Sequence, residues 1–135
     1  MSKTTVLLAL LMLGASSSSS VELTLPRVRN KAQAPGWLSF DELVSLARSV
    51  GFSMSAATYA ARIAWRESGG NPRAQNLGNT PGRKPSVERS FGLWQINTLA
   101  NRQYDETSLM DPSYNARAAY ELSHQGTSWR PWNLP

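Results

Sequence analysis

The sequence predicts a small, mainly α-helical protein with one folded domain. Three segments place apolar side chains at helical spacing between clear start and stop signals, whereas runs typical of β-strands are scarce. The chain has 135 residues, of which 41% are hydrophobic and 17% are charged. This length and composition suit a single domain with one core and argue against a disordered chain.

The N-terminal segment has the order of an export signal, in which a positive charge precedes an apolar run and then small residues. Lys3 supplies the charge, residues 6–13 are continuously apolar, and Gly14, Ala15 and five serines follow. The apolar run is shorter than the about 20 residues that a membrane span needs. We therefore expect residues 1–20 to be an export signal or, as a second interpretation, a membrane anchor.

Residues 21–36 are expected to form a linker or arm, because their prolines, glycine and basic side chains show no periodicity. The folded domain then occupies residues 37–135. Its first helix begins at a capping box, in which Ser39 is the N-cap and Glu42 lies three residues later. Apolar side chains follow at helical spacing, and Gly51 ends this helix.

A second helix is expected over roughly residues 56–68, with Ser53 or Ser55 as its N-cap. Its alanines would allow another helix to pack closely against it. A Gly-Gly pair directly after the helix favours a left-handed C-cap, and Pro72 prevents the helix from continuing.

The second half of the domain begins with a long polar loop over residues 69–90, and loops of this length are usually functional or mobile. The periodicity of SFGLWQIN, residues 90–97, does not decide between a short strand and a helix start. A last helix begins with Asp111 as its cap and Pro112 in first position, and Gly126 ends it. The aromatic, proline-containing tail is expected to pack as irregular chain.

The composition excludes several kinds of site. The absence of cysteine excludes disulfides, thiolate nucleophiles and cysteine-ligated metals, and the single His124 argues against a histidine-rich metal site. The net charge of +5 favours polyanionic partners such as an acidic cell wall, anionic lipid or nucleic acid. No dense run of lysine and arginine is present, so we do not expect nucleic acid. Five tryptophans could fill the core or stack on a sugar.

Glu67, on the last turn of the second predicted helix, is the first candidate for chemistry. A carboxylate at a helix C-terminus faces the negative end of the helix dipole, and apolar neighbours such as Trp65 or Trp94 would add to the effect. Both effects favour the protonated form, which a general acid needs. An isolated glutamate, however, is usually a solvated surface residue.

Glu67 is not isolated, because it belongs to the first of three sequence motifs that follow one another along the chain. These motifs are ESGGNPRA, SFGLWQIN and DPSYNARAAY. Together they resemble the soluble lytic transglycosylase family of the lysozyme-like superfamily, and the short phage and bacterial forms in particular. The resemblance covers roughly residues 37–132. It implies a lysozyme-like α+β domain with a central catalytic helix and little or no β-sheet.

The resemblance also implies roles for residues in the first two motifs. Glu67 matches the catalytic acid/base of the family, and Ser68 follows it as the motif requires. Gln95 falls where the family contacts the sugar, and Ser90 matches a serine that helps to hold the substrate near the acid. Trp94 takes the place of a methionine in the family motif and is a further candidate for substrate binding.

The third motif implies a weaker correspondence. Tyr114 and Asn115 match a helix start that faces the cleft of the family, and we include them among the expected substrate-binding residues. The tyrosine that the family carries on the opposite side of the cleft has no clear match. Trp129 and Trp132 lie in the corresponding region of this sequence.

The activity that the resemblance implies is cleavage of the MurNAc–GlcNAc β-1,4 bond of peptidoglycan, with formation of 1,6-anhydro-muramyl ends. The matched motifs supply one carboxylate, which fits substrate assistance by the N-acetyl group. Glu88 lies close to Ser90 in the sequence and could approach the cleft, although no family motif places it. The alternatives are a lysozyme-type muramidase and a noncatalytic peptidoglycan-binding or virion structural protein.

The expected partner is therefore the glycan strand of peptidoglycan, with the membrane as a second partner through the N-terminal segment. No metal and no cofactor is expected. The implied location is the periplasm, the cell envelope or the outside of the cell, or else a phage virion.

Overall fold

The structure is a computed structural model, and it describes residues 35–79, 81–82, 84 and 87–135. The predicted export signal or anchor over residues 1–20 lies outside the described residues, as does nearly all of the linker predicted over residues 21–36. Within the described ranges, no helix is long and apolar enough to cross a membrane.

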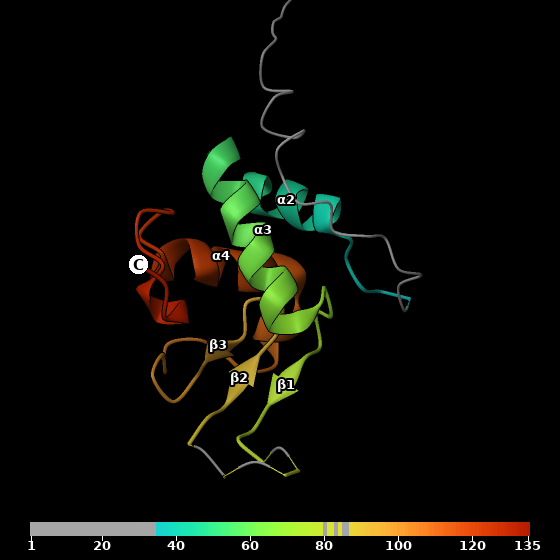
Figure 1. The fold of residues 1–135 in the computed structure, drawn as a ribbon, viewed down its shortest axis with the longest axis vertical. Helices are drawn as coiled ribbons and strands as arrows, with labels where there is room; N and C mark the ends of the chain where they lie inside the picture. Colours follow the sequence, from blue (N-terminus) through green and yellow to red (C-terminus); the bar gives the residue numbers. More distant parts are fainter. Residues whose placement is uncertain (1–34, 80, 83, 85–86) are drawn as a thin grey trace, which may run out of the picture.

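Three α-helices and a small antiparallel sheet make up the described part of the chain, so the prediction of a small, mainly α domain is confirmed. In Figure 1, α3 runs through the middle of the molecule, and its C-terminal end approaches the sheet. The helices are α2 (Phe40–Ser49), α3 (Met54–Ser68) and α4 (Pro112–Leu122). The strands are β1 (Gln75–Asn76), β2 (Ser90–Phe91) and β3 (Ile96–Asn97), and two 3-10 helices are η1 (Ser108–Met110) and η2 (Arg130–Trp132).

The starts of α2 and α3 follow from local capping, as the sequence predicted. The Ser39 hydroxyl accepts a hydrogen bond from the backbone N–H of Glu42, whose carboxylate accepts one from the N–H of Ser39. Ser53, rather than Ser55, caps α3, so this helix begins at Met54. Gly69 ends it with a φ of 64°, the left-handed conformation expected there.

The long polar loop expected over residues 69–90 contains a strand that the sequence did not indicate. In β1, Gln75 pairs with Phe91 and Asn76 pairs with Ser90. On the other side of β2, Ser90 pairs with Asn97. Two residues are too few to show the alternation of apolar and polar side chains that marks a strand in a sequence. Only the pairing with β2, which is distant in the sequence, defines β1.

SFGLWQIN forms two short strands joined by a turn, and it starts no helix. Gly92 has a φ of 81° and Gln95 has a φ of 50° in this turn. A Cβ atom on Gly92 would lie 2.2 Å from both Asn115 Nδ2 and Leu109 O. The turn therefore needs glycine both for its conformation and for its close contact with α4.

The last helix ends at Leu122, and the prediction that it extends to Gly126 was wrong. His124, Gln125 and Gly126 all have positive φ values, which a right-handed helix cannot contain. The side chain of Ser123 accepts a hydrogen bond from the N–H of Gly126 and so stabilises the turn. Neither histidine nor glutamine signals such a turn in the sequence.

The core lies where α2, α3, α4, the β2–β3 turn and the C-terminal segment meet. The alanines of α3 allow this close packing, as expected: Ala57, Ala60, Ala61 and Ala64 are buried. The indole of Trp94 is fully buried and donates to the carbonyl of Ala60. The C-terminal segment, expected to be irregular, forms η2 and buries both Trp129 and Trp132.

Candidate functional site

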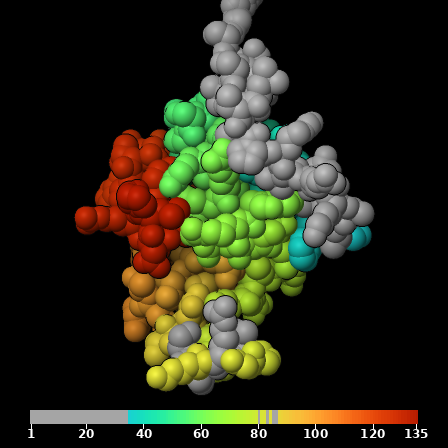
Figure 2. Space-filling view, viewed as in Figure 1, coloured from blue at the N-terminus to red at the C-terminus, as the bar shows by residue number. Residues whose placement is uncertain are grey.

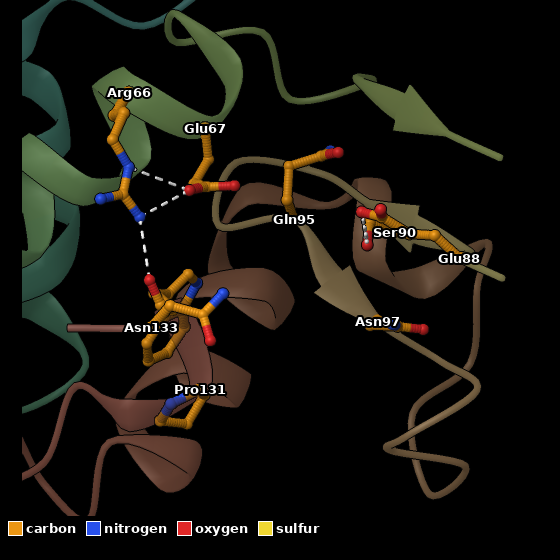
Figure 3. A pocket seen from close by; sticks show the side chains of 9 residues that line it. Arg66, Glu67, Glu88, Ser90, Gln95, Asn97, Pro131 and Asn133 are labelled. Atoms are coloured by element: carbon orange, nitrogen blue, oxygen red, sulfur yellow. Dashed lines mark hydrogen bonds and ion pairs between the residues drawn. The ribbon is translucent and has the colours of Figure 1, made fainter. Parts of the chain in front are cut away.

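A pocket of about 470 Å³ lies beside the C-terminal end of α3. Its walls come from α3, the strands and the C-terminal segment, as Figure 3 shows. In the space-filling view of Figure 2, these parts of the chain form neighbouring areas of one face. The lining residues are Arg66, Glu67, Glu88, Ser90, Gln95, Asn97, Pro131, Trp132 and Asn133.

Two other pockets of similar volume occur among the described residues, but each is lined by one short segment of chain. One is formed by residues between 120 and 125, and the other by residues between 75 and 81. The pocket at Glu67 instead brings together polar side chains from three distant parts of the sequence. It is therefore the strongest candidate for a functional site.

Glu67 projects from the last turn of α3 into this pocket, and its side chain is 27% exposed. The guanidinium of Arg66 contacts one carboxylate oxygen, Oε2, through Nη2 at 2.8 Å and Nε at 3.1 Å. No hydrogen bond from the described residues reaches the other oxygen, Oε1. The carboxylate is thus held at one oxygen and open at the other.

The surroundings of Glu67 differ from the apolar ones that the sequence suggested. Neither Trp65 nor Trp94 lines the pocket, and Trp94 is fully buried in the core. The group directly beside the carboxylate is the positively charged guanidinium of Arg66, and most of the lining is polar.

Arg66 also connects α3 to the C-terminal segment, since its Nη2 donates to the carbonyl of Trp132 at 3.2 Å. The indole of Trp132 in turn donates to the carbonyl of Trp94 at 2.8 Å. These two hydrogen bonds hold Trp132 between the C-terminal end of α3 and the β2–β3 turn. Trp132 is therefore an aromatic residue in the wall that the C-terminal segment contributes to the pocket.

Ser90 and Glu88 form a hydrogen-bonded pair on the β2 side of the pocket. The Ser90 hydroxyl donates to Glu88 Oε2 at 2.8 Å, and Ser90 is only 2% exposed. Residues two positions apart in extended chain point to the same side, which explains why both line the pocket. Asn97 joins them because it is the partner of Ser90 in the sheet.

Gln95 lines the pocket from the turn between β2 and β3. Its side-chain amide donates to the carbonyls of Ala74 at 3.1 Å and Gly92 at 3.0 Å. Both hydrogens of the amide are used in this way, so its carbonyl oxygen remains available as an acceptor.

Two residues expected to bind substrate lie in the core instead. Trp94 and Asn115 are both fully buried, and neither lines the pocket. Asn115 accepts from the N–H of Trp94 and donates to the carbonyls of Phe91 and Leu109. Both residues therefore stabilise the β2–β3 turn from the core side. This corrects their expected role as contacts to a sugar.

Ser68 and Tyr114 are also not brought to the pocket. The hydroxyl of Ser68 donates to the carbonyl of Ala64 and accepts from the N–H of Gly70, so it helps to end α3. The hydroxyl of Tyr114 accepts from the N–H of Asp105, and its ring meets that of Tyr104 edge-on.

Sequence reasoning did not single out four of the lining residues: Arg66, Asn97, Pro131 and Asn133. The alternation of side chains in extended chain could have indicated Asn97, given a pairing with Ser90. Pro131 and Asn133 carry no such signal, because their position depends on the path of the C-terminal segment. As for metals, the described residues contain no group of three or more histidine, cysteine or acidic side chains that could hold an ion.

Comparison with known proteins identifies the family to which this fold belongs. The model of a family described as a lysozyme-like domain matches residues 44–134. A search of curated proteins found no significant match. Because the family model covers more than half of the chain, the protein belongs to the family of lysozyme-like domains. This confirms the family resemblance and the fold class, and it indicates an enzyme that acts on the glycosidic bonds of peptidoglycan.

Proposed function

We propose that this protein is a lytic transglycosylase, which cleaves the MurNAc–GlcNAc β-1,4 bond of peptidoglycan and forms 1,6-anhydro-muramyl ends. The observation that supports the proposal is the convergence of Glu67, Ser90 and Gln95 in one pocket. These are the residues for which the family motifs imply a catalytic acid and two contacts to the sugar. The lysozyme-like family of the chain agrees with this substrate.

In the proposed reaction, Glu67 begins in its protonated form and gives its proton to the glycosidic oxygen. The acetamido oxygen of the muramyl sugar bonds to C1 as the glycosidic bond breaks. The hydroxyl oxygen at C6 then attacks C1, the acetamido oxygen leaves, and the hydroxyl proton passes to Glu67. The acid is thereby restored without water.

The contacts of Glu67 distinguish its two carboxylate oxygens. Both hydrogen bonds from Arg66 go to Oε2, so we assign proton transfer to Oε1. Gln95 offers its carbonyl oxygen to a sugar hydroxyl, since its two amide hydrogens already donate to the backbone.

The assignment of Glu67 is tested by Glu67→Gln, which keeps the shape of the side chain but removes its acidic proton. We expect the release of soluble fragments from purified peptidoglycan to fall at least about 100-fold, the usual contribution of a general acid. The control is Glu121→Gln, which changes a carboxylate on α4 outside this pocket. An unchanged rate in the Glu67 variant would contradict the proposal, and binding without cleavage by the parent protein would favour the noncatalytic alternative.

Hydrolysis by a muramidase is the second candidate, and the presence of Glu88 in the same pocket favours it. Most glycosidases use two carboxylates, one as an acid and the other as a nucleophile or as the base for water. Mass spectrometry of the released fragments separates the two reactions. Anhydro-muramyl ends indicate transglycosylation, whereas reducing ends indicate hydrolysis.

We further propose that the protein is exported, because peptidoglycan lies outside the cytoplasmic membrane and residues 1–20 have the order of an export signal. Retention as a membrane anchor or as part of a virion remains the alternative use of this segment.

A further inference from the structure

Glu88 contributes a carboxylate to the pocket that the proposed reaction does not use. We propose that Glu88 is a positioning residue, which acts through Ser90 to orient the acetamido group of the muramyl sugar. The inference rests on the proposed transglycosylase function and adds a residue to it. It concerns the step in which the acetamido oxygen reaches C1.

The argument begins with the single hydrogen of the Ser90 hydroxyl. This hydrogen points to Glu88 Oε2, at a distance of 2.8 Å between the two oxygen atoms. A hydrogen bond to a charged acceptor is about twice as strong as one between neutral groups, so the hydroxyl is firmly oriented. Ser90 can therefore offer only its lone pairs to a ligand.

The neighbouring groups on this wall are also acceptors. Gln95 uses both amide hydrogens on backbone carbonyls, which leaves its carbonyl oxygen. Glu88 has a second oxygen, Oε1, to which the described residues form no hydrogen bond. The side chains of Ser90, Gln95 and Glu88 therefore accept hydrogen bonds, and together they favour a ligand group that donates one.

The acetamido group of a muramyl sugar has one such donor, its N–H. An N–H held by Ser90 fixes the plane of the amide, so its carbonyl oxygen can be directed toward C1. Hydrogen bonding at the N–H also polarises the amide and increases the negative charge on that oxygen. No proton leaves Glu88 or Ser90 in this step, so their role is orientation and polarisation.

The test compares Glu88→Ala with Glu88→Gln in initial rates measured over a range of peptidoglycan concentrations. We expect the alanine variant to lose about tenfold or more in kcat, because the hydrogen of Ser90 is no longer held by a charged acceptor. The glutamine variant should lose less, because its amide oxygen can still accept the hydroxyl hydrogen. The melting temperature should change little in both, whereas a purely structural role would lower it and spare kcat.

A double-mutant cycle asks whether Glu88 acts through Ser90. In a Ser90→Ala background, Glu88→Ala should cause little further loss, because the residue through which it acts is already absent. Independent losses that multiply would overturn the proposal. The matched control is Glu121→Ala, since Glu121 also accepts a hydroxyl hydrogen, from Tyr104, but lies outside the pocket.

The products separate the failure of this inference from the failure of the proposed function. If the parent protein releases only reducing ends, transglycosylation itself is wrong. If the parent releases anhydro-muramyl ends and Glu88→Ala matches its kcat, only the role of Glu88 is wrong. The glutamine variant could also be as slow as the alanine variant, with both variants losing only the products that have reducing ends. Glu88 would then be a base that activates water, and the proposal would be overturned.

Discussion

At the scale of single residues, the ion pair between Arg66 and Glu67 defines the geometry of the proposed acid. The two residues are neighbours in the chain, yet the guanidinium reaches back to one carboxylate oxygen with two nitrogen atoms. These two charge-assisted hydrogen bonds hold Oε2 in place. Because Arg66 is 49% exposed, we assign the pair to orientation rather than to stability.

Replacing Arg66 should therefore impair catalysis more than folding. We expect Arg66→Ala to lower kcat about 10- to 100-fold, because a displaced catalytic group costs this much in rate. The matched control is Arg62→Ala, which removes an exposed arginine from the same helix outside the pocket. Rates of peptidoglycan solubilisation, measured with melting temperatures, check the prediction. Equal rates for the two variants would show that the ion pair does not position Glu67.

At the scale of elements, β2, β3 and the turn between them form one wall of the pocket on a very small sheet. Each strand has two residues, so the ladder alone contributes few hydrogen bonds. The turn is instead held by Asn115, which is buried and bonded to three backbone groups from β2, the turn and η1. Gly92 allows α4 to approach closely enough for these contacts.

The importance of this close approach can be measured with two glycines of similar conformation. Gly92 has a φ of +81° and Gly82 has a φ of +78°, but no atom of the described residues lies within 4 Å of a Cβ built on Gly82. Gly82→Ala should cost about 1–2 kcal/mol from its conformation alone. Gly92→Ala adds a collision with Asn115 and should cost about 3 kcal/mol or more. Urea unfolding compares the two, and similar losses would contradict the role given to the close contact.

The ends of the helices and the strand β1 show which structural elements can be predicted from the sequence. The starts of α2 and α3 were predictable because Ser39 and Ser53 bond to backbone a few residues away. The end of α4 was not, because left-handed His124 and Gln125 depend on packing rather than on their own preference. The strand β1 was missed for a related reason, since only its pairing with Ser90 and Phe91 defines it.

At the scale of the whole molecule, one ionic network joins the chain before β2 and the chain after β3 to Glu106. The carboxylate of Glu106 accepts two hydrogen bonds from Arg89 and one from Thr98, all between 2.7 and 2.8 Å. These contacts lower the pKa of Glu106 from 4.5 to about 2, with the hydrogen bond from Arg89 as the largest cause. The charged carboxylate is thus favoured in the folded protein.

The lowered pKa of Glu106 predicts that the stability of the folded protein falls at acidic pH. Because the pKa of Glu106 is lower in the folded state, its contribution is fully present above pH 4.5 and is lost as the pH falls toward 2. Glu106→Gln should therefore be less stable than the parent at neutral pH and should lose less stability across this window. Urea unfolding at a series of pH values provides the test. Parallel losses in both proteins would show that other groups control the acid response.

The pocket as a whole was only partly predictable. Glu67, Ser90 and Gln95 belong to motifs, and the structure brings all three together. The wall that contains Trp132 and Asn133 depends on how the C-terminal segment returns across the molecule, which no local pattern describes. The structure also separates pocket residues from buried neighbours such as Asn115, a distinction that the sequence does not make.

The hydrogen bonds that hold Trp132 have a consequence for protein synthesis. Glu67 leaves the ribosome long before Trp132 and Asn133, which complete its pocket. A nascent chain with a fully formed α3 therefore still lacks one wall of the site. The pocket is therefore complete only once the returning C-terminal segment has docked, so the site forms late in the folding of the chain.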